Sequence, residues 1–233
     1  MRPFCRILAI AFIGSLLCGF ALQTSPETCS LECVLKKMDE AAANFRSAQA
    51  DFVWDQYQKV VDEHDTQKGT VYYRRVGKEI EMMAEIKEPD AKFVLYKDGK
   101  IQVYQPKIEQ VIVYPTAGNQ SEIESYLVLG FGGSGEDLKK SYDLSYLGEE
   151  TVGGIATAKL QLIPKSEKSR NNVSKILLWI DLSRGISVQQ KFEESQGDSR
   201  LAKYSAIQVP AKIGNEAFQL KTTKKTQFVS PRG

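Results

Sequence analysis

The sequence predicts a mainly β protein, built from one curled antiparallel sheet with a small helical cover. Apolar and polar residues alternate with period two through most of the 233-residue chain, and turn residues separate the alternating segments. A long helical pattern occurs near the start and a brief one in the middle. About ten or eleven strands in one layer curl or close. We therefore expect the two helical segments to cover the concave face.

Residues 1–21 have the pattern of a secretory signal peptide. Arg2 and Arg6 precede an apolar run over residues 7–22, and small residues precede the expected cleavage point after Ala21. An uncleaved anchor helix is the alternative, but the run is only marginally long enough to span a bilayer. We expect a single secreted domain over residues 22–233.

Composition argues against several function classes. The chain has 31 basic and 29 acidic residues, and Arg2 and Arg6 leave with the leader, so the mature charge is near zero. Because the mature chain has no net positive charge, we do not expect nucleic acid as a partner. His64 is the single histidine and lies in a polar segment, so we expect no metal site, no catalytic triad and no cofactor.

An amphipathic helix is predicted from Ser30 to about Ala48. Its apolar residues recur at helical spacing and its charged residues lie on the other side; the apolar set is Leu31, Val34, Leu35, Met38, Ala41, Ala42 and Phe45. Cys29 and Cys33 are candidates for a local disulfide in an oxidising compartment. Two helical residues four apart are nevertheless awkwardly placed for such a bond.

A hairpin is predicted over residues 69–86, with its turn at Val76-Gly77. Pairing Arg75 with Lys78 places Tyr73 opposite Ile80. Because side chains alternate between faces, the apolar residues share one face; they are Val71, Tyr73, Ile80, Met82, Ala84 and Ile86. Arg75 lies on this apolar face as well.

The next stretch predicts a three-stranded meander. Asp98-Gly99 is a strong hairpin signal, and a four-residue loop from Pro106 to Glu109 sets the second hairpin. One face carries no charge, and the other is also unusually apolar for a wetted surface. We expect the uncharged face to line a hydrophobic cavity, with filling by the protein's own side chains as the alternative. This face comprises Val94, Tyr96, Ile101, Val103, Ile112 and Tyr114.

The middle segment predicts a short covering helix followed by a hinge. Ser121 and Glu124 form a capping box, and Tyr126 and Leu127 belong to the apolar side. The following GFGGSG matches the dinucleotide fingerprint in its letters, but the required strand before it and parallel strand after it are not predicted. We expect a glycine hinge, one helical turn over residues 136–140, and then strands up to FQLKTTKKTQF at residues 218–228.

Motifs along the mature chain are similar, in order, to the LolA family of periplasmic lipoprotein carriers. ANFRSAQADF resembles the start of that family, GTVYYRR resembles its Gly-x-Leu-x-x-x-Arg-Pro strand, and LYKDGKIQVYQPKIEQV resembles its Asp-Gly hairpin. GGIATAKLQLIPKSE, ILLWIDLSRGISVQQKFEESQGD and YSAIQVPAKIGNEAFQL follow its C-terminal half. The proline that follows the family arginine is absent here, so either Arg74 or Arg75 could correspond to that arginine. The spacing from Gly69 and the position on the apolar face of the hairpin favour Arg75.

The resemblance implies an open, incomplete antiparallel β-barrel with an α-helical lid, which carries acylated lipoproteins through the periplasm. It also implies an inner-membrane transporter as donor and an outer-membrane acceptor, and an arginine that locks the lid. We expect a monomer without enzymatic activity. A glycolipid or free-lipid carrier and an envelope-stress sensor are the alternatives. The expected cavity-lining residues are Leu35, Met38, Phe45, Val71, Tyr73, Ile80, Met82, Val94, Tyr96, Ile101, Val103, Ile112, Tyr114, Tyr126 and Leu127.

Overall fold

The computed structural model describes residues 29–77, 79–116, 118, 126–127, 129 and 131–231. The expected leader and the capping box at Ser121 and Glu124 lie outside the described residues. Tyr126 and Leu127 are described and are helical. Within the described ranges, no helix combines the length and the apolar character that crossing a membrane requires.

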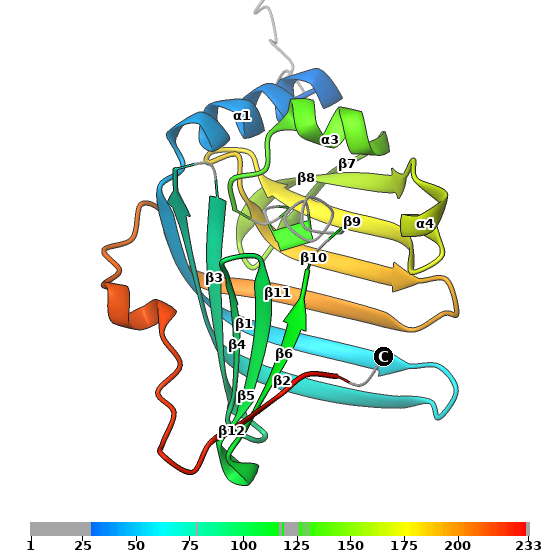
Figure 1. Ribbon diagram of the computed structural model, residues 1–233. Helices are drawn as coiled ribbons and strands as arrows, with labels where there is room; N and C mark the ends of the chain where they lie inside the picture. Colours follow the sequence, from blue (N-terminus) through cyan, green and yellow to red (C-terminus); the bar gives the residue numbers. More distant parts are fainter. Residues whose placement is uncertain are drawn as a thin grey trace, which may run out of the picture.

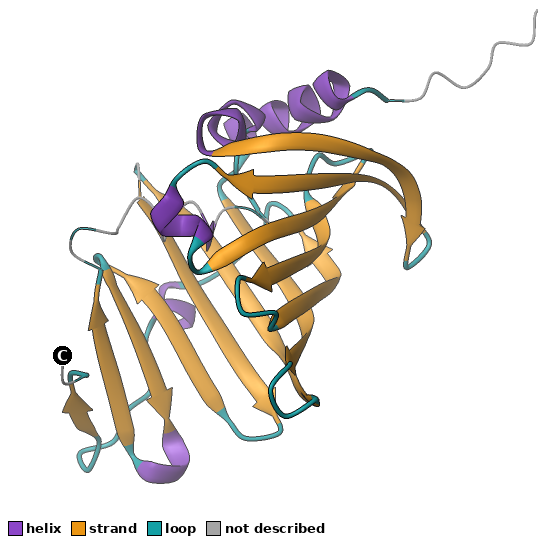
Figure 2. Ribbon diagram, turned by 90° about the vertical axis from the view of Figure 1, so that its right-hand side faces the viewer, coloured by secondary structure: helices purple, strands orange, loops and turns teal. Residues whose placement is uncertain are grey.

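The chain forms one curled sheet of twelve strands that does not close into a barrel (Figures 1 and 2). The spatial order is β12-β6-β5-β4-β3-β2-β1-β11-β10-β9-β8-β7. The strands are β1 Ser47–Gln58, β2 Glu63–Val76, β3 Glu79–Glu88, β4 Lys92–Lys97, β5 Lys100–Gln105, β6 Gln110–Pro115, β7 Tyr142–Val152, β8 Ile155–Pro164, β9 Val173–Asp181, β10 Ser187–Glu194, β11 Ser199–Gln208 and β12 Gln227–Val229. The predicted open, mainly β fold is confirmed, with twelve strands instead of about ten or eleven; β12 runs parallel to β6.

Helices α1 and α3 lie side by side across one end of the sheet (Figure 1). The helical segments are α1 Leu31–Asn44, η1 Pro106–Ile108, α3 Gly135–Ser141, α4 Glu167–Arg170 and η2 Asn215–Phe218. The Ser30 hydroxyl caps α1 by accepting a hydrogen bond from the Cys33 amide. The helix ends earlier than the predicted limit near Ala48, because the backbone from Ser47 onward pairs with β2.

Cys29 and Cys33 are joined by a disulfide at the start of α1. Their Cα atoms are 5.5 Å apart, within the ordinary range for such a bond. Cys29 precedes the extended N-cap residue Ser30 (φ −69°, ψ 168°). Since only Cys33 belongs to the helix, the pair avoids the helical spacing that the sequence argument considered awkward.

The meander has the predicted register. Tyr96 faces Ile101 and Val94 faces Val103 across the Asp98-Gly99 turn, and Val103 in turn faces Ile112. Its uncharged face therefore is a continuous surface on β4, β5 and β6.

The β2–β3 hairpin differs from the prediction by two residues. Arg75 faces Ile80 and Tyr73 faces Met82, because the turn begins at Gly77, whose φ of +62° suits a tight hairpin turn. Since side chains alternate with period two, a shift of two residues leaves every side chain on its predicted face.

The C-terminal segment covers the apolar outer face of β3 and β4, where it runs down the outside of the sheet (Figure 1). Phe218 is buried against Met83 and Leu95. The Arg74 guanidinium carbon lies 4.2 Å from the centre of the Phe218 ring, and Arg74 also donates a hydrogen bond to Glu81. The prediction of a strand over residues 218–228 was wrong except at β12. The outer face of β4 is therefore apolar because the C-terminal segment covers it.

Candidate functional site

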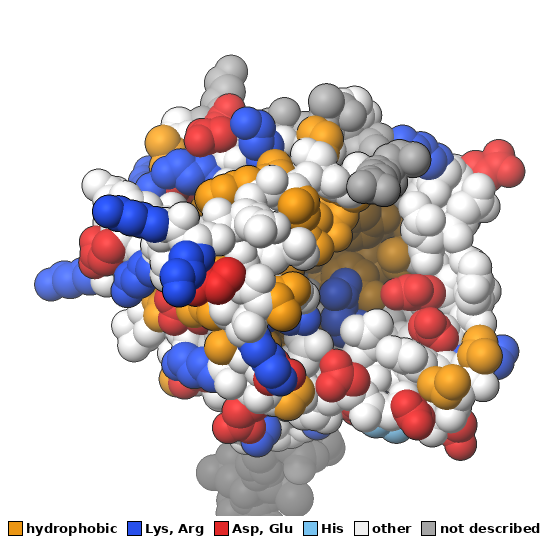
Figure 3. All heavy atoms as spheres, turned by 60° about the horizontal axis from the view of Figure 1, so that its bottom comes forward, with side chains coloured by type: hydrophobic (Ala, Val, Ile, Leu, Met, Phe, Trp, Pro, Cys, Tyr) orange, Lys and Arg blue, Asp and Glu red, His pale blue; other side chains and the backbone are white. Residues whose placement is uncertain are grey.

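A cavity of about 390 Å³ lies between the inner face of the sheet and the lid. We call α1, α3 and the described residues from 126 to 134 the lid. Figure 3 looks into a hollow with hydrophobic side chains along its depth. The volume is within the range of small-molecule sites, roughly 300–1,000 Å³. The cavity is lined by Trp54, Tyr73, Met82, Val94, Tyr96, Ile101, Tyr126, Leu127, Val173, Gln190, Phe192, Arg200, Ala202 and Tyr204.

Seven of the expected lining residues lie on this wall, namely Tyr73, Met82, Val94, Tyr96, Ile101, Tyr126 and Leu127. Leu35 and Met38 instead pack in a core cluster between α1, α3 and strands β7 to β9. Phe45, Val71 and Ile80 belong to a second buried cluster, to which β1 to β4 contribute most residues. Side chains therefore fill a large part of the inner face.

The remaining three expected residues lie farther along the meander. Val103 lines an adjoining cavity of about 220 Å³. Ile112 is partly exposed on β6, and Tyr114 on the same strand is 40% exposed. The described cavity thus ends before β6.

The sequence argument missed the opposite half of the wall, on β1, β9, β10 and β11; these residues are Trp54, Val173, Gln190, Phe192, Arg200, Ala202 and Tyr204. Alternation in residues 199–208 groups Arg200, Ala202 and Tyr204 on one face, and this signal was present in the sequence. It does not say which face points inward. The long-range pairing of β11 with β1, which places Ala202 opposite Trp54, decides that.

Arg75 connects the sheet to the lid. Its guanidinium donates hydrogen bonds to the Ala42 carbonyl near the end of α1 and to the Gly132 carbonyl, each at 3.3 Å. The guanidinium carbon also lies 5.7 Å from the centre of the Phe45 ring. Arg74, the other candidate, donates to Glu81 on the outer face. Of the two arginines, Arg75 therefore has the lid contacts.

The glycine-rich stretch places an aromatic residue against the cavity wall. Phe131 is fully buried, and its ring centre lies 5.3 Å from that of Tyr73 and 5.2 Å from that of Tyr204. Gly132 has φ +99°, and a Cβ there would lie 2.8 Å from a Phe45 ring carbon. Glycine at this position thus allows the backbone after Phe131 to lie close against the Phe45 ring. The helix that follows leads into antiparallel strands, unlike a dinucleotide site.

Burial governs the titration of two tyrosines in the cavity wall. Burial raises the pKa of Tyr73 well above its usual value, and it raises the pKa of Tyr204 to about 12, while Arg200 opposes both shifts. Both hydroxyls are therefore neutral at neutral pH. Arg200 is consequently the only formally charged side chain among the described lining residues.

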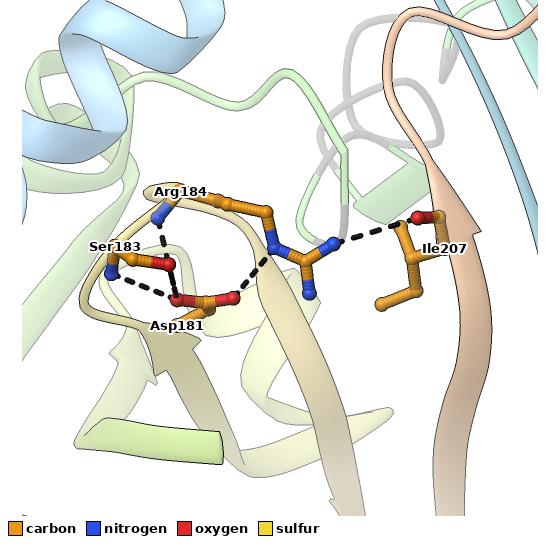
Figure 4. A network of polar contacts seen from close by, with 4 residues as sticks. All are labelled: Asp181, Ser183, Arg184 and Ile207. Atoms are coloured by element: carbon orange, nitrogen blue, oxygen red, sulfur yellow. Dashed lines mark hydrogen bonds and ion pairs between the residues drawn. The ribbon is translucent and has the colours of Figure 1, made fainter.

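Hydrogen bonds order the β9–β10 turn and join it to β11 (Figure 4). The Asp181 carboxylate accepts hydrogen bonds from the Ser183 amide and hydroxyl and from the Arg184 amide and Nε. Burial would raise the pKa of Asp181, but these hydrogen bonds outweigh it and lower the pKa. Next to this network, Gly185 approaches the Lys37 carbonyl of α1 so closely that a Cβ would lie 2.3 Å from the oxygen.

A family model described as "Outer membrane lipoprotein carrier protein LolA" matches residues 43–221, most of the chain. The chain belongs to the LolA family. The LolA match begins near the end of α1 and includes the cavity, Arg75 and η2. A search of curated proteins found no match to this sequence.

Solved structures share the LolA fold at low sequence identity. An uncharacterized conserved protein from Thermus thermophilus is 13% identical with a TM-score of 0.54; the match covers 86% of this chain and 98% of that one. A structure of the Pseudomonas aeruginosa MucA/MucB complex matches at 15% identity and a TM-score of 0.51, covering 85% of this chain and 63% of the other. A crystal structure of MucB matches similarly, at 15% identity and 0.52 over 84% and 64%. This LolA family member thus spans less than two thirds of those two chains.

Proposed function

We propose that this LolA family member is a periplasmic carrier that holds the acyl chains of lipoproteins in the cavity and moves them from the inner to the outer membrane. The observation that carries the proposal is the largely apolar cavity between the inner face and the lid. An inner-membrane transporter would deliver the cargo, an outer-membrane acceptor would receive it, and the carrier would act as a monomer.

The energetics of transfer require such a cavity. Removing an acyl chain from a bilayer loses roughly 0.8 kcal/mol per methylene, so a sixteen-carbon chain loses roughly 12 kcal/mol. A water-exposed chain would leave this loss uncompensated, whereas contact with apolar and aromatic walls recovers much of it. The wall residues Tyr96, Met82 and Phe192 supply such contacts.

Release requires a stable empty state. In the closed lid, Arg75 donates to Ala42 and Gly132, which stabilises the protein without cargo. A ligand shifts the lid only by its differential affinity for the open and closed states. The two hydrogen bonds therefore oppose loading and favour release.

The test is mass spectrometry of an organic extract from protein expressed with its own leader and purified from the periplasm. We expect acylated peptides or lipids from the wild type, and none from Ala202→Phe, because Ala202 is a buried wall residue that phenylalanine would extend into the cavity. Lys203→Phe, on the exposed other face of β11, is the matched control and should retain them. Wild-type protein without bound acyl chains, and unable to take them from vesicles, would refute a carrier.

A protein-binding sensor is the second candidate, because a similarly folded chain occurs in the MucA/MucB complex. The same extraction separates the candidates. Acylated peptides identify a lipoprotein carrier, and free lipids identify a glycolipid or lipid carrier. A protein empty of lipid that co-purifies with one envelope protein identifies the sensor.

A further inference from the structure

A buried amide interrupts the apolar wall of the cavity. Gln190, on β10, is 4% exposed and lines the cavity. Among the described residues, nothing forms a hydrogen bond with its side chain. The amide atoms are not fully enclosed by the protein, so they remain accessible from the cavity with their hydrogen-bonding capacity unused. The cavity-facing amide is therefore suited to bind a polar atom of a ligand.

Arg200 is the second polar feature of the wall. Its guanidinium carbon lies 5.6 Å from the centre of the Phe192 ring and 5.9 Å from that of the Trp54 ring. It forms no ion pair with any residue in the described part of the chain. The two rings restrict the guanidinium group through cation–π contacts and leave its hydrogen-bond donors available. A planar guanidinium group with free donors is well suited to a phosphate or carboxylate.

Arg200 lies where the apolar cavity meets a more polar one. Arg200, Trp54 and Val94 line both the large cavity and the adjoining 220 Å³ cavity. The adjoining cavity also contains Lys92 and Asp65, so charged groups occur only on that side of the junction. An amphiphile whose chain occupies the large cavity would place its headgroup near Arg200.

The strand register relates the two polar groups to each other. Gln190 faces Ala202 across β10 and β11, and Ala202 is two residues from Arg200 on the same face. Diagonal neighbours of this kind are about 7–8 Å apart. The small Ala202 side chain leaves the space between the two polar groups open to the cavity.

We propose that the cavity selects amphiphiles with an acidic headgroup: Arg200 binds the phosphate or carboxylate, and Gln190 donates a hydrogen bond to a carbonyl nearer the acyl chain. This proposal rests on the proposed function, since it assumes that acyl chains occupy the cavity. It adds a criterion for cargo that apolar contacts alone do not provide. Arg200 is exposed at the cavity mouth, so a neutral amphiphile would fill the same cavity but would make no charge-assisted contact with it.

The test compares two ligands that differ only in the phosphate, 1-myristoyl-lysophosphatidic acid and 1-monomyristoylglycerol. Isothermal titration calorimetry on delipidated full-length protein should give about tenfold tighter binding of the phosphate ligand, as for one charge-assisted contact. Arg200→Gln should abolish the preference, so that the phosphate ligand and the glycerol ester bind this variant with equal affinity. Lys203→Gln removes the same charge from the outer face of the same strand and should retain the preference. Gln190→Leu should lower the affinity for both ligands equally, because both contain the ester carbonyl.

The outcomes distinguish this proposal from the carrier proposal. Equal binding of the two ligands, or an unchanged preference in Arg200→Gln, overturns the headgroup site and leaves the carrier intact. Failure of both ligands to bind overturns both proposals. Inorganic phosphate binding as tightly as the lysophosphatidate overturns the amphiphile site in favour of a free-anion site. The wild-type preference should also decrease with added salt, a measurement that needs no variant.

Discussion

Replacing Arg75 with leucine should shift the lid toward its open state. The change removes two hydrogen bonds from a charged donor, to Ala42 and to Gly132, each 3.3 Å long. Hydrogen bonds to charged groups contribute about 1.5–3 kcal/mol each, and these are longer than the usual N–H···O range. We therefore expect a total loss of about 2–3 kcal/mol, which corresponds to about a 30- to 150-fold higher open-to-closed ratio.

Hydrogen–deuterium exchange measures this shift directly. In Arg75→Leu, amides of α1 and of residues 131–134 should exchange faster by about the same factor, while β8 and β9 remain unchanged. Cargo should load more readily and leave more slowly. Arg74→Leu is the control, because it removes an adjacent charge that contacts the outer face. Lid amides that exchange at the wild-type rate in Arg75→Leu, or equally fast in both variants, would refute the lid-locking role.

Three further predictions concern stability. Gly185→Ala should lower the melting temperature more than Gly148→Ala does, because both glycines have positive φ but only Gly185 would place its Cβ against Lys37 of α1; thermal melts of the two variants compare these effects. Phe218→Ala should lower the free energy of unfolding by about 3–5 kcal/mol and expose the C-terminal segment to protease; equal stability and protease resistance would contradict the covering role. Because burial raises the pKa of folded Tyr204 to about 12, the unfolded chain releases this proton first, so denaturant stability should fall between about pH 10 and 12. Tyr204→Phe should lack that component.

The half of the site built from local hairpins could be predicted from the sequence. Asp98-Gly99 fixes one turn, and alternation then determines which residues share a face, as for Tyr96 and Ile101. Even the incorrect β2–β3 register kept Tyr73 and Met82 inside, because the shift was an even number of residues.

The other half depends on contacts between distant parts of the chain. Arg200 and Gln190 reach the cavity only because β11 pairs with β1, about 150 residues away in the sequence. The cover on the outer face depends similarly on Phe218 returning to Met83 and Leu95. Apolar alternation shows that a face is buried, but not whether a lid, a core or a terminal segment buries it. Helical periodicity has the same limit, which is why Leu35 and Met38 were expected on the wall and lie in a core cluster.

The curled sheet is open between its two end strands, β7 and β12. The circumference of a closed barrel is fixed by its number of strands and their stagger. In this protein the described end strands are not bonded to each other, so a change in the twist of the sheet would alter its circumference without breaking an interstrand hydrogen bond. Under the proposed carrier function, such an open wall would accommodate acyl chains that differ in number and bulk.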